Sequence, residues 1–313
     1  MPETTALPDT PAAPPPRLLL IVNRHARNGG ASVAEALDIL RDGGREVVEH
    51  QCGPGEKLAD VIRARAAEGL AAVVLGGGDG TLNAAAPALK DTGLPMGILP
   101  LGTANDLARS LGIPADAADA ARIIAQGRLR RIDLGEVNGH LFFNVASIGF
   151  SAELAQELRA EAKQRWGKLG YAIAAFRLLR RARPFTAWIT QDGQVRRVKT
   201  LQISVGNGRH YGGGMTVASS ARPDDGKLDI YSLEVAHWWR LLALLPYLRL
   251  GTHGQWRDVR SFQALECKVV TRRPMPINTD GELSTSTPAR FHLWPGCIQV
   301  FAPAQNPSNR PQP

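Results

Sequence analysis

The sequence has few of the residues that hold small secreted or metal-stabilised domains together. Its 313 residues include three cysteines, Cys52, Cys267 and Cys297, which form no C-x-x-C pair, and its seven histidines are scattered. Aromatic residues make up 6% of the chain, and no apolar run approaches the ~20 residues that a membrane-spanning helix needs. We therefore expect no disulfide or zinc framework and no transmembrane anchor.

Both ends of the chain have the composition of disordered segments. Residues 1–16 are rich in Pro, Ala and Thr and lack the basic start and apolar centre of a signal peptide. Residues 303–313 have a similar composition. The sequence therefore predicts a disordered leader and a disordered tail around an ordered, cytoplasmic protein.

The rest of the chain has the composition of a globular protein with unevenly placed charge. Its length corresponds to about two average domains, and 44% of the residues are hydrophobic. The net charge is +8, and from Arg159 to Arg183 eight Lys or Arg residues stand against one acid, Glu161. Such a segment suits nucleic acid or an anionic membrane surface, whereas a solvated helix face is the alternative interpretation.

A glycine-rich loop at 76–83 is the most informative segment. The apolar run 73–75 leads into Gly-Gly-Gly-Asp-Gly-Thr-Leu-Asn, and a helix-compatible segment follows. In a strand–turn–helix of this kind the backbone N–H groups form a concavity that holds phosphate oxygens. Asp79 would repel phosphates unless a cation lies between, so the loop predicts a nucleotide with Mg²⁺; alternatively, Asp79 only caps the following helix. The loop lacks the Lys of a Walker A motif and is no Rossmann fingerprint.

Strands alternate with helices in the first half of the chain. The apolar segments at 18–22, 73–75 and 96–100 are typical of buried parallel strands. We expect helices at 31–42, 57–69, 84–89, 103–112, with Thr103 as its N-cap, and 116–126. This pattern predicts a doubly wound, Rossmann-like α/β domain whose strand-end loops, 76–83 and 102–106, face one cleft.

The second half is richer in short, turn-bounded β segments, which predict a mostly antiparallel β-sandwich domain. These segments lie at 132–137, 140–145, 186–190, 198–205, 228–233, 267–271, 275–278 and 289–294. Two helical inserts, at about 151–182 and 236–252, interrupt them. The second insert combines Trp238, Trp239 and several leucines with arginine, which favours an interfacial membrane surface over a buried helix.

Five motifs in order resemble the diacylglycerol kinase catalytic-domain family, and most closely its bacterial soluble lipid kinases of the YegS and DgkB type. The motifs lie at 76–83, 97–106, 206–214, 223–228 and 278–282, within a likeness that spans about 17–302. The resemblance implies a nucleotide-binding α/β domain (17–131 plus a returning strand at about 289–302) and a lipid-binding β-sandwich domain (132–288). It also implies an active site in the cleft between them, where the γ-phosphoryl group of ATP passes to a lipid hydroxyl with Mg²⁺.

The same resemblance assigns roles to single residues. The nucleotide contacts would be Asn23, Cys52, Gly77, Gly78, Asp79, Gly80, Thr81, Leu82, Asn83 and Thr103. Cys52 stands where the family often has Thr. Asp225, with the backbone carbonyls of Arg222 and Lys227, would hold a structural Mg²⁺, although a solvated turn is the alternative. Asn207 and Arg209 would reach phosphate or a lipid headgroup, or shape their turn.

The late Asp-Gly-Glu motif supplies the catalytic group that the resemblance implies. An alcohol is a poor nucleophile, so a carboxylate that accepts its proton would assist the transfer. Glu282 is the implied proton acceptor with Asp280 beside it, and Asp79 completes the group. Gly281 would let the turn expose both carboxylates to the cleft, whereas a hairpin turn with solvent-facing acids is the alternative.

The expected partner is a lipid alcohol at an anionic membrane surface, with diacylglycerol, phosphatidylglycerol and sphingoid or ceramide-like lipids as candidates. Association with the inner face of the membrane would be peripheral and reversible, oligomers are possible, and no nucleic acid is expected. An NAD kinase is the nearest rival, but it would carry Asn-Glu where this chain has Asn83-Ala84. A basic membrane- or nucleic-acid-binding module without catalysis leaves the glycine loop unexplained.

Overall fold

The computed structural model describes residues 16–23, 29–53, 55–154, 181–208, 210–211, 215–216, 222–234 and 259–304. The expected leader and tail lie outside the described residues, apart from Pro16 and residues 303–304. Most of the basic segment, the Trp-rich insert, Arg209 and the glycines at 212–214 also lie outside them. The predictions made for these segments therefore stay predictions.

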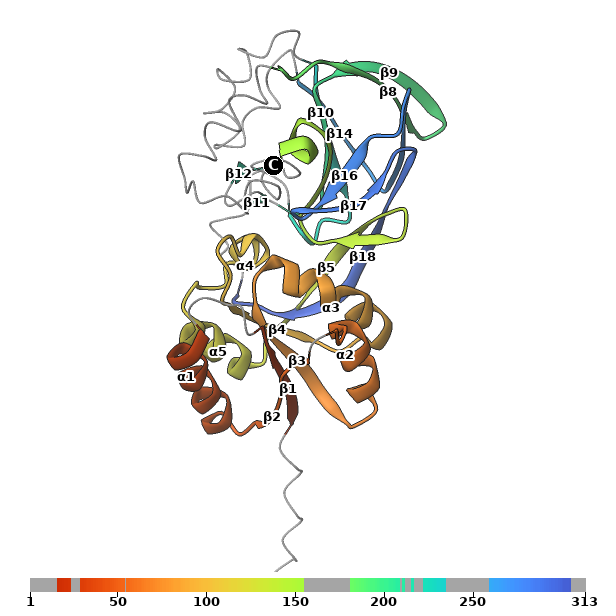
Figure 1. Cartoon of the computed structure of the whole chain (residues 1–313). Helices are drawn as coiled ribbons and strands as arrows, with labels where there is room; N and C mark the ends of the chain where they lie inside the picture. The colour runs from red at the N-terminus through yellow and green to blue at the C-terminus, as the bar shows by residue number, and fades with distance from the viewer. Residues whose placement is uncertain are drawn as a thin grey trace, which may run out of the picture.

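The first half of the chain folds into a parallel sheet with helices on both faces (Figure 1). Its strand order is β2-β1-β3-β4. The strands are β1 (Arg17–Val22), β2 (Glu46–His50), β3 (Leu70–Gly77) and β4 (Met96–Pro100). The helices are α1 (Gly29–Asp42), α2 (Leu58–Ala66), α3 (Asp79–Thr92), α4 (Asp106–Leu111) and α5 (Ala117–Gln126). α1 packs with α5 on one side and α2 with α3 on the other, which confirms the doubly wound α/β domain.

Apolar runs bring the central strands into the core. The side chains at 18–21 in β1 and 73–75 in β3 are at most 2% exposed. Strands covered by helices on both faces need such uninterrupted apolar stretches, because neither face meets water. The carboxyl ends of these strands therefore form one rigid edge from which the polar loops project.

The second half forms two packed sheets around a second core. One sheet has the order β14-β13-β10-β7-β16-β17, and the other contains β5, β6, β8, β9, β15 and β18. The first of these is built from β7 (Val145–Gly149), β10 (Gln202–Gly206), β13 (Leu228–Leu233), β14 (Val259–Ala264), β16 (Pro276–Thr279) and β17 (Glu282–Ser286). The second adds β5 (Leu129–Val137), β6 (His140–Phe142), β8 (Phe185–Gln191), β9 (Gln194–Thr200), β15 (Glu266–Thr271) and β18 (Ala289–Phe301). A short pair, β11 (His210–Tyr211) and β12 (Met215–Thr216), stands apart.

One long strand, β18, connects the two halves. Its first part pairs with β15, most of its length pairs with β5, and Val300 near its end lies beside Met96 of β4. Within the described residues, a single ten-stranded sheet therefore runs from the parallel first half into the antiparallel second half. Figure 1 shows β18 and β5 passing side by side between the two halves.

Several expected strands differ in extent from the observed ones. The segment expected at 198–205 is two strands, β9 and β10, separated at Leu201. The segment at 140–145 contains β6 and the first residue of β7. β14 and β17 were not predicted, because both carry polar side chains that face water on one or both sides.

Among the described residues, no helix combines the length and the apolar content required to cross a bilayer.

Candidate active site

The glycine loop places two strand-end loops in direct contact. A Cβ on Gly102 would collide with the Cα of Gly78, and a Cβ on Gly77 would collide with the Thr81 side chain. The N–H of Leu101 donates to the carbonyl of Gly77 at 3.0 Å. Glycine is therefore required here for close approach of one backbone to another, and the loops after β3 and β4 form one unit.

Asp79 fixes this unit by capping a helix other than its own. Its Oδ2 accepts the N–H of Asp106 and its Oδ1 accepts the N–H of Leu107, each at 3.1 Å. The prediction that Thr103 caps this helix was wrong. The helix begins at Asp106 after Asn105, whose φ is 50°, and its first N–H groups bond to a carboxylate from the preceding loop.

A cleft of about 1120 Å³ lies beside the glycine loop. Its lining includes six of the predicted site residues: Asn23, Cys52, Gly78, Gly80, Thr81 and Glu282. The Asn23 side chain donates to Thr81 Oγ1 at 3.3 Å, so the loop after β1 is tied to the start of α3. Segments from the ends of β1, β2 and β3 thus meet the start of β17 around one cavity.

Two other predicted nucleotide contacts, Thr103 and Leu82, do not line this cleft. Thr103 lines a separate cavity of about 590 Å³, together with Ser32, Asn105 and Arg109. Leu82 is 2% exposed and packs in the core of the first half. Gly78, which lines the larger cavity, lies against Gly102, which lines the smaller one. The expectation that the loops 76–83 and 102–106 face one cleft stays a prediction.

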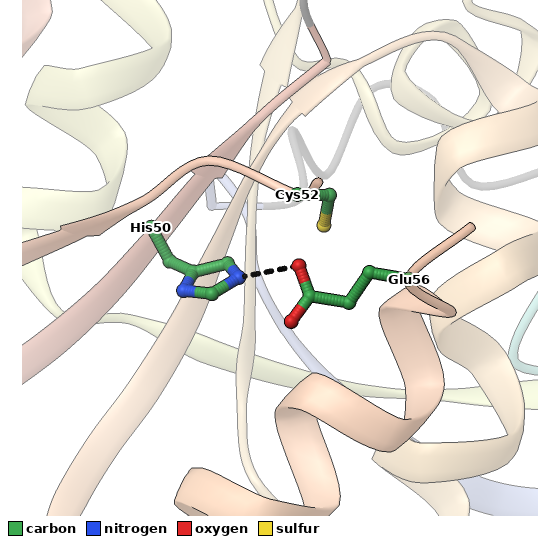
Figure 2. Close-up of side chains that lie close together, drawn as sticks. All are labelled: His50, Cys52 and Glu56. Carbon is green, nitrogen blue, oxygen red and sulfur yellow. Dashed lines mark hydrogen bonds and ion pairs between the residues drawn. The ribbon is translucent and has the colours of Figure 1, made fainter. Parts of the chain in front are cut away.

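Cys52 lies in a polar corner of the larger cleft (Figure 2). Oε2 of Glu56 accepts the N–H of Gly53 at 2.9 Å and lies 3.2 Å from Nε2 of His50. These contacts lower the pKa of Glu56, whereas burial and the charge of Glu56 raise the pKa of the Cys52 thiol. The thiol therefore stays protonated at neutral pH in the absence of a bound cation.

The two acids of the Asp-Gly-Glu motif have different surroundings. The Asp280 carboxylate accepts the backbone N–H groups of Phe143, Asn144 and Val145 at 2.7–3.2 Å. Burial nevertheless raises the pKa of Asp280 to about 6, and the nearby charge of Asp79 adds to this effect. The expectation that both carboxylates face the cleft is wrong for Asp280, because its oxygens bond to the loop between β6 and β7.

Glu282, by contrast, has an exposed side chain that lines the cleft. It is the first residue of β17, and the turn before it holds Asp280 and Gly281 at φ values of 46° and 95°. The N–H of Gly281 donates to Oδ1 of Asn278 at 2.8 Å. The turn is thus anchored through Asp280, and it presents the Glu282 carboxylate to the cavity that the glycine loop also lines.

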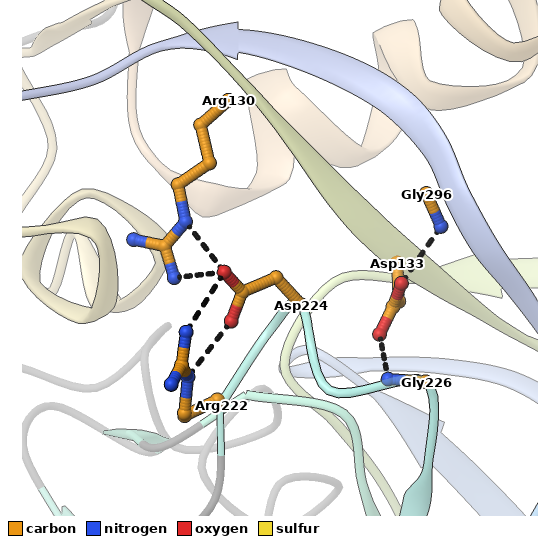
Figure 3. Close-up of polar contacts among 6 residues, drawn as sticks. All are labelled: Arg130, Asp133, Arg222, Asp224, Gly226 and Gly296. Carbon is orange, nitrogen blue, oxygen red and sulfur yellow. Dashed lines mark hydrogen bonds and ion pairs between the residues drawn. The ribbon is translucent and has the colours of Figure 1, made fainter. Parts of the chain in front are cut away.

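The acidic turn at 223–227 is bonded to β5 and, through Asp133, to β18, the two strands that pass between the halves (Figure 3). Asp224 pairs with Arg130 of β5 at 2.7 Å and with Arg222 at 3.0 Å. Asp133 of β5 accepts the N–H groups of Gly226 and Gly296 at 2.8 and 2.7 Å. Sequence reasoning missed Asp133, since nothing in a strand sequence indicates that its acid anchors two distant backbone segments.

Asp225, the predicted metal ligand, lies in an acidic environment within this turn. Its Oδ1 accepts the N–H of Lys227 at 3.1 Å. Burial, followed by repulsion from Asp229 and Asp133, raises the pKa of Asp225 to about 6. A carboxylate among other acids fits a hard cation such as Mg²⁺, whose charge would relieve this repulsion.

Two asparagines, Asn207 and Asn83, support the junction between the halves. Asn207 is 1% exposed, and its amide donates to the carbonyls of Asp133 and Phe143, each at 3.0 Å. Asn207 therefore shapes the junction through these bonds. The Asn83 side chain bonds to Asp280, and its Oδ1 is buried without a partner within the described residues. An amide oxygen in that position is available to a ligand or cation.

Both halves of the chain match known protein families. Residues 17–137 match the family described as the diacylglycerol kinase catalytic domain, and residues 144–302 match the YegS C-terminal NAD kinase beta sandwich-like domain. A Pseudomonas aeruginosa protein named "Probable lipid kinase YegS-like" is 31% identical over 94% of this chain and 97% of its own length. A diacylglycerol kinase of Mycobacterium tuberculosis is 32% identical over 86% of this chain and 88% of its own length. The crystal structure of a Bacillus anthracis diacylglycerol kinase superposes with a TM-score of 0.75 at 27% identity, covering 95% of this chain and 99% of that one.

Proposed function

Because the chain belongs to the diacylglycerol kinase catalytic domain family, we propose that it transfers the γ-phosphoryl group of ATP to the hydroxyl group of a lipid. The observation that carries this proposal is the cleft in which the glycine loop and Glu282 line the same cavity. A kinase that phosphorylates an alcohol needs a loop that holds the phosphates and a carboxylate that accepts the hydroxyl proton. Here the two halves of the chain supply one each to the same cavity.

The nucleotide phosphates would bind at the start of α3. The N–H groups near Gly78, Gly80 and Thr81 lie at the N-terminus of a fourteen-residue helix, whose dipole favours negative charge. The bond from Asn23 to Thr81 holds the loop in place. Binding there would direct the γ-phosphate toward the part of the cleft that Glu282 lines.

Magnesium fits the oxygen donors beside this loop. The Asp79 carboxylate keeps a lone pair on each oxygen besides the two that bond to α4, and the buried Oδ1 of Asn83 has no partner within the described part of the chain. When bound, the ion would neutralise phosphate charge during transfer. At the second site, Asp225 and the carbonyls of Arg222 and Lys227 would hold a structural Mg²⁺.

The chemistry assigned to this chain's own residues is a single proton transfer. The lipid hydroxyl oxygen attacks the γ-phosphorus, the bond to the β–γ bridging oxygen breaks, and ADP leaves. The hydroxyl proton passes to the Glu282 carboxylate. Asp280 is a positioning residue, since its bonds to the backbone at 143–145 hold the turn that carries Glu282.

A basic sheet face supports peripheral association with an anionic membrane. This face is the outer face of β8, β9, β15 and β18. Trp188 of β8 lies on it between its two cross-strand neighbours, Arg197 of β9 and Val270 of β15. Arg197, Lys199, Lys268 and Arg290 are exposed on this face, and none forms an ion pair within the described residues. The acids Glu266 and Glu136 on the same face are bonded to His292 and Trp294. Cations around an aromatic ring suit an anionic lipid surface.

The decisive experiment is transfer of radiolabelled phosphate from γ-labelled ATP to a panel of lipids in mixed micelles. The panel contains diacylglycerol, phosphatidylglycerol, a sphingoid base and ceramide, with NAD⁺ tested in parallel. We expect Mg²⁺-dependent labelling of one lipid class and none with Glu282→Gln. Labelling of NAD⁺ alone would replace the lipid by a nucleotide acceptor, and ATP binding without any labelling would contradict catalysis.

A further inference from the structure

Three potential metal ligands converge where the chain leaves β2 and enters the cleft. His50 is the last residue of β2, Cys52 follows it by two positions, and Glu56 lies just before α2. One ligand atom from each of these side chains lies within 4.8 Å of the other two. Figure 2 shows the imidazole, the thiol and the carboxylate pointing toward one another from the two sides of this loop.

The spacing of these atoms matches a tetrahedral ion. In a tetrahedral site with metal–nitrogen and metal–oxygen bonds of ~2.0–2.1 Å, two such ligand atoms lie about 3.3 Å apart. Nε2 of His50 and Oε2 of Glu56 are 3.2 Å apart, so this pair already has the separation of two ligands. The longer metal–sulfur bond, ~2.3 Å, tolerates a slightly greater distance to Sγ of Cys52.

The backbone supports the carboxylate in this position. The N–H of Gly53 donates at 2.9 Å to the same Oε2 atom that faces His50. A hydrogen bond of this kind fixes the orientation of a ligand before metal arrives. His50 and Cys52 are partly buried and Glu56 is exposed, so the three atoms form a supported site that an ion can reach from solvent.

We propose that His50, Cys52 and Glu56 bind a thiophilic divalent cation such as Zn²⁺, and that this ion opposes nucleotide binding in the adjoining cleft. Sulfur and imidazole ligands select zinc-like ions over Mg²⁺, which prefers oxygen. Binding converts the Cys52 thiol to a thiolate whose proton passes to solvent, and His50 binds as the neutral imidazole through Nε2. The sequence did not indicate this site, because its three ligands are of three different types.

The second part of the proposal rests on the proposed function. Cys52 and Glu56 line the same cavity as Gly78, Thr81 and Glu282. Because two of its three ligands line the cavity, a bound ion would take space that the nucleotide would use. By thermodynamic reciprocity, nucleotide then weakens metal binding by the same factor.

The metal site is tested by titrating the full chain with Co²⁺. Thiolate-to-cobalt charge-transfer absorption in the near ultraviolet reports a Co–S bond directly and needs no enzyme activity. We expect one Co²⁺ per chain, a band that Zn²⁺ removes, loss of the band in Cys52→Ser, and binding at least tenfold weaker in His50→Gln and Glu56→Gln.

Cys297→Ser is the matched control, because Cys297 is also partly buried but lies outside the cluster. It should keep the band. Absence of a band in the wild-type chain, its survival in Cys52→Ser, or its loss in Cys297→Ser would overturn the site. Circular dichroism of each variant separates loss of a ligand from loss of the fold.

The coupling is tested by the affinity of a fluorescent ATP analogue with excess Mg²⁺, with and without one equivalent of Zn²⁺. We expect Zn²⁺ to weaken analogue binding about tenfold in the wild-type chain and to have no effect on His50→Gln. Zn²⁺ bound with unchanged analogue affinity would overturn the coupling alone. Absence of analogue binding to the wild-type chain with Mg²⁺ and without Zn²⁺ would contradict the proposed function and leave the cobalt result standing.

Discussion

Asp280 and Glu282 stand two residues apart in one turn, yet their carboxylates have different tasks. The first bonds to three backbone N–H groups, and the second lines the cleft. The sequence could indicate a turn with two acids here. It could not show which acid faces the cleft, because the partners of Asp280 lie in the distant loop at 143–145.

Substitution should separate these two roles. Glu282→Gln should lower kcat by about 10²–10⁴-fold, since it removes the proton acceptor, and should leave the free energy of unfolding nearly unchanged because the side chain is exposed. Asp280→Asn should instead cost about 1–3 kcal/mol of stability, because its NH2 group replaces one of the two oxygens that accept the backbone N–H groups of 143–145. Lipid phosphorylation and denaturant unfolding of both variants test this. Near-normal turnover by Glu282→Gln, or wild-type stability of Asp280→Asn, would contradict the assignment.

At the scale of elements, the Asp79 carboxylate ties the start of α3 to the start of α4. Asp79→Asn keeps one acceptor of the two that cap α4, so we expect the free energy of unfolding to fall by about 1 kcal/mol. Nucleotide binding should weaken in the same variant, because the loop that holds the phosphates loses its anchor and its charge. Urea unfolding and ATP-analogue titration measure the two effects. An unchanged unfolding midpoint would show that the cap contributes little.

Element boundaries were predictable where the signals are local. The start of α5 follows Asp116, whose side chain accepts the N–H of Asp119 three residues later, and the sequence indicated that start. The start of α4 was misplaced because its capping group comes from Asp79 in another loop. β17 was missed for a similar reason, since its side chains are polar and pairing with β16 defines it.

The acidic turn at 223–227 gives a prediction about pH. The pKa of Asp225 is raised from 3.8 to about 6, so its ionised form is disfavoured in the folded chain. Without metal, stability should therefore fall as pH rises from about 4 through about 6, by about 1 kcal/mol once solvent screening of this half-buried group is taken into account. Asp225→Asn should remove the part of this dependence that comes from Asp225 and leave the part from Asp280, whose pKa is also raised to about 6.

Added Mg²⁺ should act in the opposite direction. At pH 7 it should raise the melting temperature of the wild-type chain more than that of Asp225→Asn, because the cation compensates the charge that burial disfavours. Thermal unfolding across pH, with and without Mg²⁺, tests both statements. Equal Mg²⁺ effects on the two proteins would remove Asp225 from the metal site.

At the scale of the whole molecule, the basic sheet face predicts salt-sensitive membrane binding. Arg197→Glu should weaken binding to vesicles rich in phosphatidylglycerol by about tenfold, since each basic side chain near such a surface contributes about 1 kcal/mol. Arg128→Glu, with the same charge change at an exposed site of the first half, is the matched control. Vesicle co-sedimentation at increasing salt measures both. Equal losses in the two variants would indicate that net charge alone governs binding.

The overall architecture was predictable because the two halves of the sequence differ in pattern. Continuous apolar runs such as 73–75, alternating with helices, indicated parallel strands covered on both faces, and short, turn-bounded β segments such as 267–271 indicated an antiparallel domain. The pairing of β18 with β4, β5 and β15 is a different kind of information. The family resemblance implied that this strand returns to the first half, but its pairing with β5 and β15 was not predicted, because no local sequence pattern identifies a distant partner strand.

The position of β18 after all of its partner strands in the chain has a consequence for biosynthesis. β4, β5 and β15 all leave the ribosome before the strand that pairs with them. Until that strand emerges, each of them has an open edge that could pair with another chain. The nascent first half therefore cannot complete its sheet alone, and folding of both halves is completed only after β18 has emerged.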